Sequence, residues 1–101
     1  RYKVEGRDVF ETVPVTPWEA ALGGDIAVPT PSGTVAVTVP PNSQTGRKLR
    51  LKGRGIPAAQ PGDLYLLLEV VLPPANDDKA RELYATMARE MAFNPRQKLG
   101  G

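Results

Sequence analysis

The sequence predicts a mainly β fold: a small β-sandwich with a short helical turn near its start and an amphipathic helix at its end. Runs of β-forming residues alternate apolar and polar side chains between Gly- and Pro-rich turns, which is typical of strands with one buried face. One early segment carries helix-capping residues, and one late segment has apolar residues at helical spacing. About five strands fit before the late helix.

The first predicted strand covers residues 8–15, where three valines share a face with Glu11. In the next segment, TPWEAALGG, Thr16 can act as N-cap, with Glu19 three residues later as its capping-box partner. Pro17 suits the first helical position and Gly23 suits the end of a helix. A helical turn therefore follows the first strand.

A hairpin is predicted next, because two alternating runs at 25–30 and 34–40 are joined by the turn residues Pro-Ser-Gly. The side chains expected to face the core from its second strand are Val35, Val37 and Val39. The run LYLLLEVVL at 64–72 is apolar on both faces, as expected of a central strand covered on both sides.

The late helix is predicted to begin at an Asn76 cap, with Asp77 and Asp78 in its first turn, and to end at Asn94 and Pro95. Its apolar stripe consists of Ala80, Leu83, Tyr84, Met87, Ala88 and Met91. This stripe must be covered, either by the chain's own sheet or by a second copy, because a helix of about 15 residues is marginal alone in water.

Basic residues are concentrated in one further strand, GRKLRLKGRG at 46–55, although the net charge is only +2. The five basic residues are Arg47, Lys48, Arg50, Lys52 and Arg54. Leu49 and Leu51 alternate with them, so we expect the leucines to be buried and the charges to face solvent. This patch is either a solvated face or a contact surface for phosphates.

The composition excludes several classes of function. The chain has 101 residues, enough for one domain, and contains no Cys and no His. Disulfides, thiolate or imidazole metal sites and His-based triads are therefore impossible. With no phosphate-loop or dinucleotide-binding glycine motif either, we expect no catalysis, no metal site and no cofactor.

The chain starts at Arg1 rather than Met, so we expect it to be part of a longer protein. It contains no apolar run of membrane-spanning length and no signal-peptide pattern. Absence of Cys is compatible with a reducing compartment. These features favour a cytoplasmic protein without membrane contact.

Three ordered motifs, VPVTPWEAALGGDIAVPT, VPPNSQTGRKLRLKGRGIP and GDLYLLLEVVLPP, resemble the second C-terminal domain of DnaJ-type J-domain co-chaperones over residues 2–92. With Trp18 and without zinc-finger Cys, the chain most resembles the curved-DNA-binding subfamily. The resemblance implies a sandwich at 1–74, a dimerisation helix at 75–94 and a tail at 95–101. The J-domain, whose signature includes His, lies outside this chain.

The family resemblance also implies partners and sites. The partners are unfolded client polypeptides, a second copy of the chain, and the seventy-kilodalton heat-shock chaperone through the missing J-domain. The positions matching the family's peptide groove are Val13, Ile26 and Val28. The expected dimer contacts are Leu83, Tyr84, Met87 and Met91.

Two functions stay open at this stage. The first is a client-binding and dimerising module of a co-chaperone. The second is sequence-tolerant, nucleoid-associated DNA binding through the basic strand, which the subfamily name implies.

Overall fold

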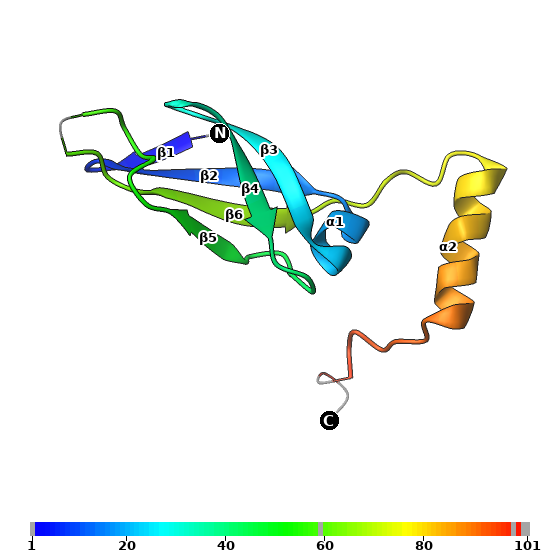
Figure 1. Ribbon diagram of the computed structural model, residues 1–101. Coiled ribbons are helices and arrows are strands. Elements are labelled where there is room, and N and C mark those ends of the chain that lie inside the picture. Colours follow the sequence, from blue (N-terminus) through cyan, green and yellow to red (C-terminus); the bar gives the residue numbers. More distant parts are fainter. Residues whose placement is uncertain (1, 59, 98, 100–101) are drawn as a thin grey trace.

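The computed structural model describes residues 2–58, 60–97 and 99. Two sheets form the domain: a four-stranded sheet in the order β1-β2-β6-β5, and a hairpin of β3 and β4 (Figure 1). The strands are β1 Tyr2–Glu5, β2 Asp8–Val15, β3 Gly24–Thr30, β4 Gly33–Val39, β5 Lys48–Leu51 and β6 Leu64–Val70. The helices are α1 Pro17–Leu22 and α2 Asp78–Glu90. The predicted fold class is confirmed.

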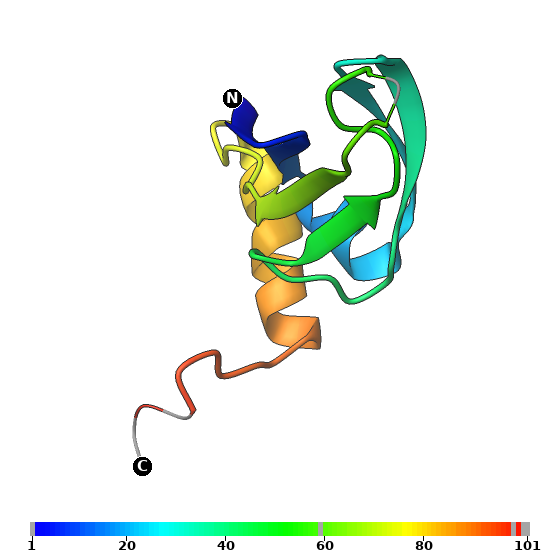
Figure 2. The same ribbon diagram turned by 90° about the vertical axis from the view of Figure 1, so that its left-hand side faces the viewer.

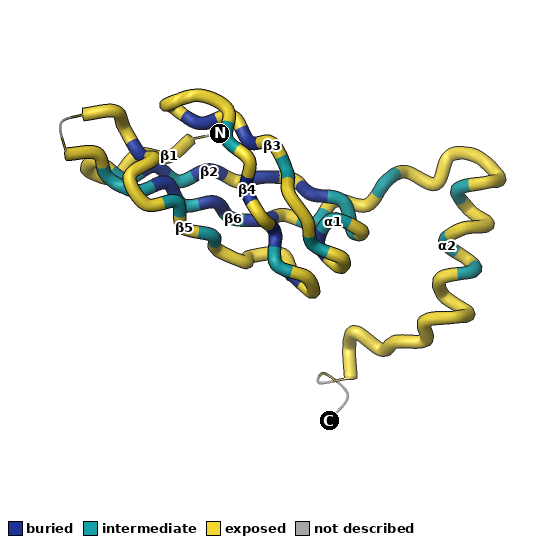
Figure 3. Tube along the Cα trace, in the orientation of Figure 1, coloured by how far each residue is buried: buried dark blue, intermediate teal, exposed yellow. Residues whose placement is uncertain are grey.

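The core lies between the β3–β4 hairpin and one face of the larger sheet, where the buried residues of Figure 3 gather. Alternate residues of each strand point inward, because side chains on a strand change face at every step. The buried apolar side chains are Val9, Val13, Val15, Ala20, Val28, Val37, Val39, Leu64, Leu66 and Leu68. Glu11 is buried on the same face of β2.

Strand β6 is an inner strand, as predicted, running parallel to β2 and antiparallel to β5. The expectation that it is covered on both faces is wrong. Its inward leucines are buried, whereas Tyr65 and Leu67 on the other face are only half-buried. The outer face carries stacked aromatic rings, Phe10 on Tyr65 with centroids 5.0 Å apart, and this partial cover explains the apolar sequence.

Strand β1 was not predicted from the sequence. Its four residues alternate apolar Tyr2 and Val4 with charged Lys3 and Glu5, a strand pattern only four residues long, and all four are exposed. It pairs antiparallel with β2 across a two-residue turn that begins with Gly6, whose φ of 65° suits a tight hairpin. The short alternation and the glycine turn were therefore the local signals for this strand.

The predicted caps of α1 are all present. The Thr16 side chain accepts a hydrogen bond from the Glu19 backbone N–H, and the Glu19 carboxylate accepts one from the Thr16 N–H. Gly23 ends the helix with a φ of 76°. The last carbonyls of α1 accept hydrogen bonds from the loop after β4, since the backbone N–H groups of Asn42 and Ser43 donate to Ala21 and Ala20.

Helix α2 differs from its prediction at both ends. Its cap is Asp77, one residue later than expected, and the Asp77 carboxylate accepts from the Ala80 N–H. The helix ends at Glu90, short of Asn94; the side chains of its last turn are exposed, and helix ends fray where tertiary contacts are few.

Helix α2 stands away from the sandwich at the end of an extended linker (Figure 1), and in the view of Figure 2 it lies behind the sheets. The radius of gyration is 17.0 Å, against about 13 Å for a compact chain of this length. None of its described side chains is buried. The stripe therefore does not pack on its own sheet in this arrangement.

Candidate functional site

An apolar groove of about 630 Å³ lies between α1 and α2. One wall consists of Pro17, Trp18, Ala21 and Leu22, and the floor of Pro73 and Pro74. The other wall is the α2 stripe, from Ala80 through Leu83, Tyr84 and Met87 to Met91. The four predicted dimer residues therefore share one surface.

The linker and α2 are held to each other by one polar contact. The Tyr84 hydroxyl donates a hydrogen bond of 2.6 Å to the Pro73 carbonyl. Pro73 and Pro74 restrict the backbone between the sandwich and the helix, because each proline ring fixes φ. Tyr84 thus orients the helix in addition to contributing apolar surface.

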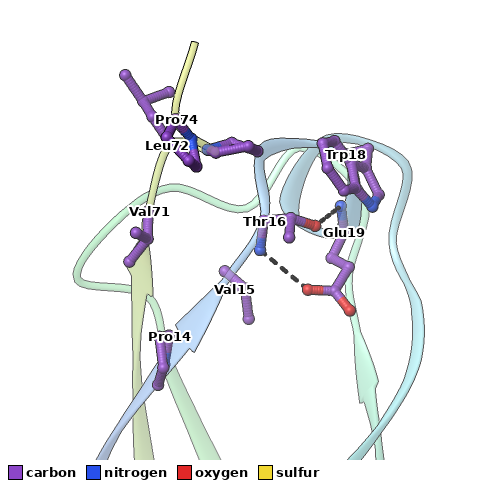
Figure 4. Close-up of a pocket in the computed structure, with 9 residues that line it drawn as sticks. Pro14, Val15, Thr16, Trp18, Glu19, Val71, Leu72 and Pro74 are labelled. Carbon is purple, nitrogen blue, oxygen red and sulfur yellow. Dashed lines mark hydrogen bonds between the residues drawn. The ribbon is translucent and has the colours of Figure 1, made fainter. Parts of the chain in front are cut away.

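Two apolar residues of α1, Trp18 and Leu22, were not assigned a role from the sequence, yet they are 56% and 78% exposed. Figure 4 shows Trp18 projecting from the capped first turn of α1, across from Leu72 and Pro74. A smaller depression of about 380 Å³ lies at this point. The missed signal was their i, i+4 spacing on a helix that contributes Ala20 to the core from another side.

The positions expected to bind peptide are mostly interior. Val13 and Val28 are 8% and 1% exposed, so their side chains pack in the core rather than along an open groove. Ile26 is half-buried against the core. The alternation that placed these residues on one face was correct, but that face is the one the sheets share. Peptide binding here stays a prediction.

The basic strand is the edge strand β5. Its charges are exposed, as predicted, while Leu49 and Leu51 are half-buried against the core rather than fully buried. Lysines on an edge strand discourage pairing with other sheets, which favours the solvated-face interpretation. The structure adds neighbours that the sequence did not reveal, because the Lys48 Nζ lies 5.5 Å from the Tyr65 ring centre.

One member of the basic patch, Arg50, forms a salt bridge within the domain. Arg50 Nη2 lies 2.6 Å from Asp63 Oδ2. Asp63 also accepts a 3.0 Å bond from the Gly53 N–H, and its own N–H donates to Asp8. The Gly53 hydrogen bond, then the Arg50 contact, lower the pKa of Asp63. This network ties the edge strand to the loop that follows it.

The Asp63 network predicts acid sensitivity. Because the folded-state pKa lies below the ordinary value of 3.8, its stabilising contribution is present above that value and is lost as pH falls through the folded pKa. In Asp63→Asn, the free energy of unfolding from urea titrations should fall less steeply below about pH 4. Glu90→Gln, on exposed α2, is the matched control. Parallel acid profiles for Asp63→Asn and the parent would contradict the prediction.

Two kinds of feature are absent from the residues that the structure describes. No group of three potential metal-ligating side chains occurs among them. No helix in this part of the chain is long and apolar enough to cross a membrane.

Comparison with known proteins supplies the family. Residues 1–73 match the DnaJ C terminal domain model. The chain is 53% identical over 100 residues to a Curved DNA-binding protein of Coxiella burnetii, covering 99% of the chain and 32% of the relative. It is 50% identical over 97 residues to that of Pseudomonas putida, covering 94% and 30%. The chain thus spans about a third of the length of these relatives.

The matched residues include both sheets and α1, whereas α2, the second wall of the groove, lies beyond them. The chain is similar over nearly its whole length to curved-DNA-binding proteins and belongs, as a non-catalytic domain, to the DnaJ C-terminal domain family.

Proposed function

We propose that this domain dimerises through α2 and presents its sandwich to unfolded client polypeptides in the bacterial cytoplasm. The observation that carries the proposal is the exposed stripe of α2, where Leu83 and Met91 are 59% and 66% exposed. Met and Tyr are enriched in interface cores, and such a stripe requires a cover. As the family resemblance implies, a J-domain would connect the bound client to the seventy-kilodalton heat-shock chaperone.

Dimerisation is tested by sedimentation of the double variant Leu83→Asp, Met87→Asp. The parent should sediment as a dimer at micromolar concentration and the variant as a folded monomer, because charges buried in an apolar interface lose hydration without gaining partners. Circular dichroism serves as the folding check. A parent that stays monomeric at high micromolar concentration would sink the dimer.

Client binding would use the hairpin sheet, because β3 and β4 each pair with one strand only. A free strand edge offers backbone N–H and C=O groups to an extended peptide, and half-buried Ile26 lies on β3. The buried Val13 and Val28 would hold the backbone of this region in place rather than contact a client.

Sequence-tolerant DNA binding is the second candidate, favoured by the five exposed basic residues on and beside β5. The Tyr65 ring lies between Phe10 on β2 and Lys48 on β5. The ring is thus already stacked on Phe10, with the Lys48 ammonium beside it, and these neighbours would compete with unstacked bases. Contact with the phosphates of duplex DNA fits this arrangement better than stacking on a single strand.

Titration with duplex DNA and with an unfolded peptide, followed by backbone amide shifts, separates the two functions. DNA should shift residues 47–54 with steep salt dependence, whereas peptide should shift residues 24–30 with shallow salt dependence. Replacing Lys48, Lys52 and Arg54 by Ala should weaken DNA binding without unfolding, since Arg50 keeps its Asp63 contact.

The matched control for the DNA titration removes the same charge elsewhere, by replacing Lys79, Arg89 and Arg96 with Ala. Unchanged DNA affinity in the β5 variant would reduce the patch to a solvated edge. Peptide shifts absent from residues 24–30 would remove the hairpin edge as a client site.

A further inference from the structure

We propose that Trp18 and Leu22 of the sandwich form part of the dimer interface, so that the α2 helix of a second copy seats between α1 and α2. This inference rests on the proposed dimerisation and adds to it a docking surface on the folded domain. It follows from where the stripe points, how much surface it offers, and how the groove is held open.

The direction of the stripe comes first. Leu83, Met87 and Met91 line the same groove as Trp18 and Leu22. The stripe faces α1 across this space instead of pointing away from the sandwich. Any helix that covers the α2 stripe must therefore enter the groove and contact α1 as well.

The size of the interface points the same way. A large apolar side chain contributes roughly 60 to 120 Å² on burial, so the three exposed α2 side chains supply at most on the order of 400 Å². A stable interface buries about 800 Å² on each partner. Trp18, Leu22 and the exposed Leu72 beside them extend the apolar surface towards that size.

The groove is preformed. Tyr84 is bonded to the Pro73 carbonyl and the two prolines restrict the linker, so α2 is held at a set distance from α1 before a partner arrives. Preorganisation of this kind lowers the entropy cost of association.

A second copy of the chain is the occupant that both covers the α2 stripe and fills the groove. Each copy carries the same uncovered stripe and the same groove, so a two-fold contact fills two grooves and covers two stripes at once. A client segment would fill one groove, but client sequences differ and need not match its length. The α2 helix of a second copy is about 20 Å long, the same length as the wall that α2 provides.

Trp18 is the only tryptophan of the chain, so its emission reports on the groove directly. In the dimer its emission should lie at shorter wavelength, and dilution or the Leu83→Asp, Met87→Asp variant should shift it to longer wavelength. Leu22→Asp should weaken the dimer roughly tenfold or more by sedimentation. Thr12→Asp, on the exposed outer sheet face, should not.

Three results would overturn the inference, and they are distinguishable. A parent dimer whose Trp18 emission is insensitive to dissociation, with a harmless Leu22→Asp, would leave α2 dimerisation standing and remove α1 from the interface. A parent that never dimerises would remove both proposals. A Trp18 shift that follows added unfolded peptide and not protein concentration would assign the groove to a client.

Discussion

Leu66→Ala is expected to lower the free energy of unfolding by about 2 to 5 kcal/mol, the range for a Leu-to-Ala cavity in a core that relaxes only partly. Leu66 has no exposed surface, and it lies on an inner strand, paired with Glu11 of β2 and Leu49 of β5. The cavity would open at the junction of both sheets. Urea unfolding followed by circular dichroism measures the change.

Leu67→Ala provides the matched control for Leu66→Ala, because Leu67 is the next residue of β6 and its half-buried side chain lies on the outer face. Its cost should be clearly smaller, since a partly exposed side chain loses less transfer free energy and leaves no closed cavity. Equal costs for the two leucines would contradict the assignment of inner and outer faces. The loss of unfolding free energy for Leu51→Ala should likewise be smaller than that for Leu66→Ala, because Leu51 is half-buried.

Gly23→Ala is expected to cost about 3 kcal/mol, from two separate causes. The φ of 76° is unfavourable for a residue with a Cβ, at roughly 1 to 2 kcal/mol. A Cβ would also lie 2.7 Å from the Val39 carbonyl oxygen and 2.9 Å from the Pro41 nitrogen, so backbone must shift, which typically costs about 1 to 3 kcal/mol.

Gly6→Ala separates these two causes. Gly6 has a similar φ of 65°, but no atom lies within 4 Å of its added Cβ. Its cost should therefore reflect the backbone conformation alone, and the excess for Gly23 should reflect the clash. If both variants lose the same stability in urea unfolding, the close approach of α1 to the loop after β4 does not constrain position 23.

Features encoded by short-range patterns could be predicted from the sequence. The capping box at Thr16, the hairpin of β3 and β4 and the inward valines each depend on residues close in the chain. Burial on the second face of β6 could not be predicted, because its neighbours Phe10 and Lys48 come from distant segments. An apolar strand has the same sequence pattern whether its second face is covered by a further layer of structure or only by side chains of adjacent strands.

The candidate surfaces show the same division. The period of the α2 stripe identified residues on one face, but only the structure shows that this face is turned towards Trp18 and Leu22. The valines proposed for peptide binding have the pattern of any inward-facing position, so alternation alone cannot separate a groove from a core. A groove is a property of three-dimensional spacing and not of residue type.

The stiff linker of Pro73 and Pro74, fastened by Tyr84, has a consequence for avidity. In a dimer joined through α2, a rigid linker would fix the distance between the two sandwiches. Two sites at a fixed span raise each other's effective concentration for a chain long enough to reach both, and do nothing for a shorter one. Tyr84→Phe removes the hydrogen bond to Pro73, so the distance between the two sandwiches would vary while each sandwich stays folded.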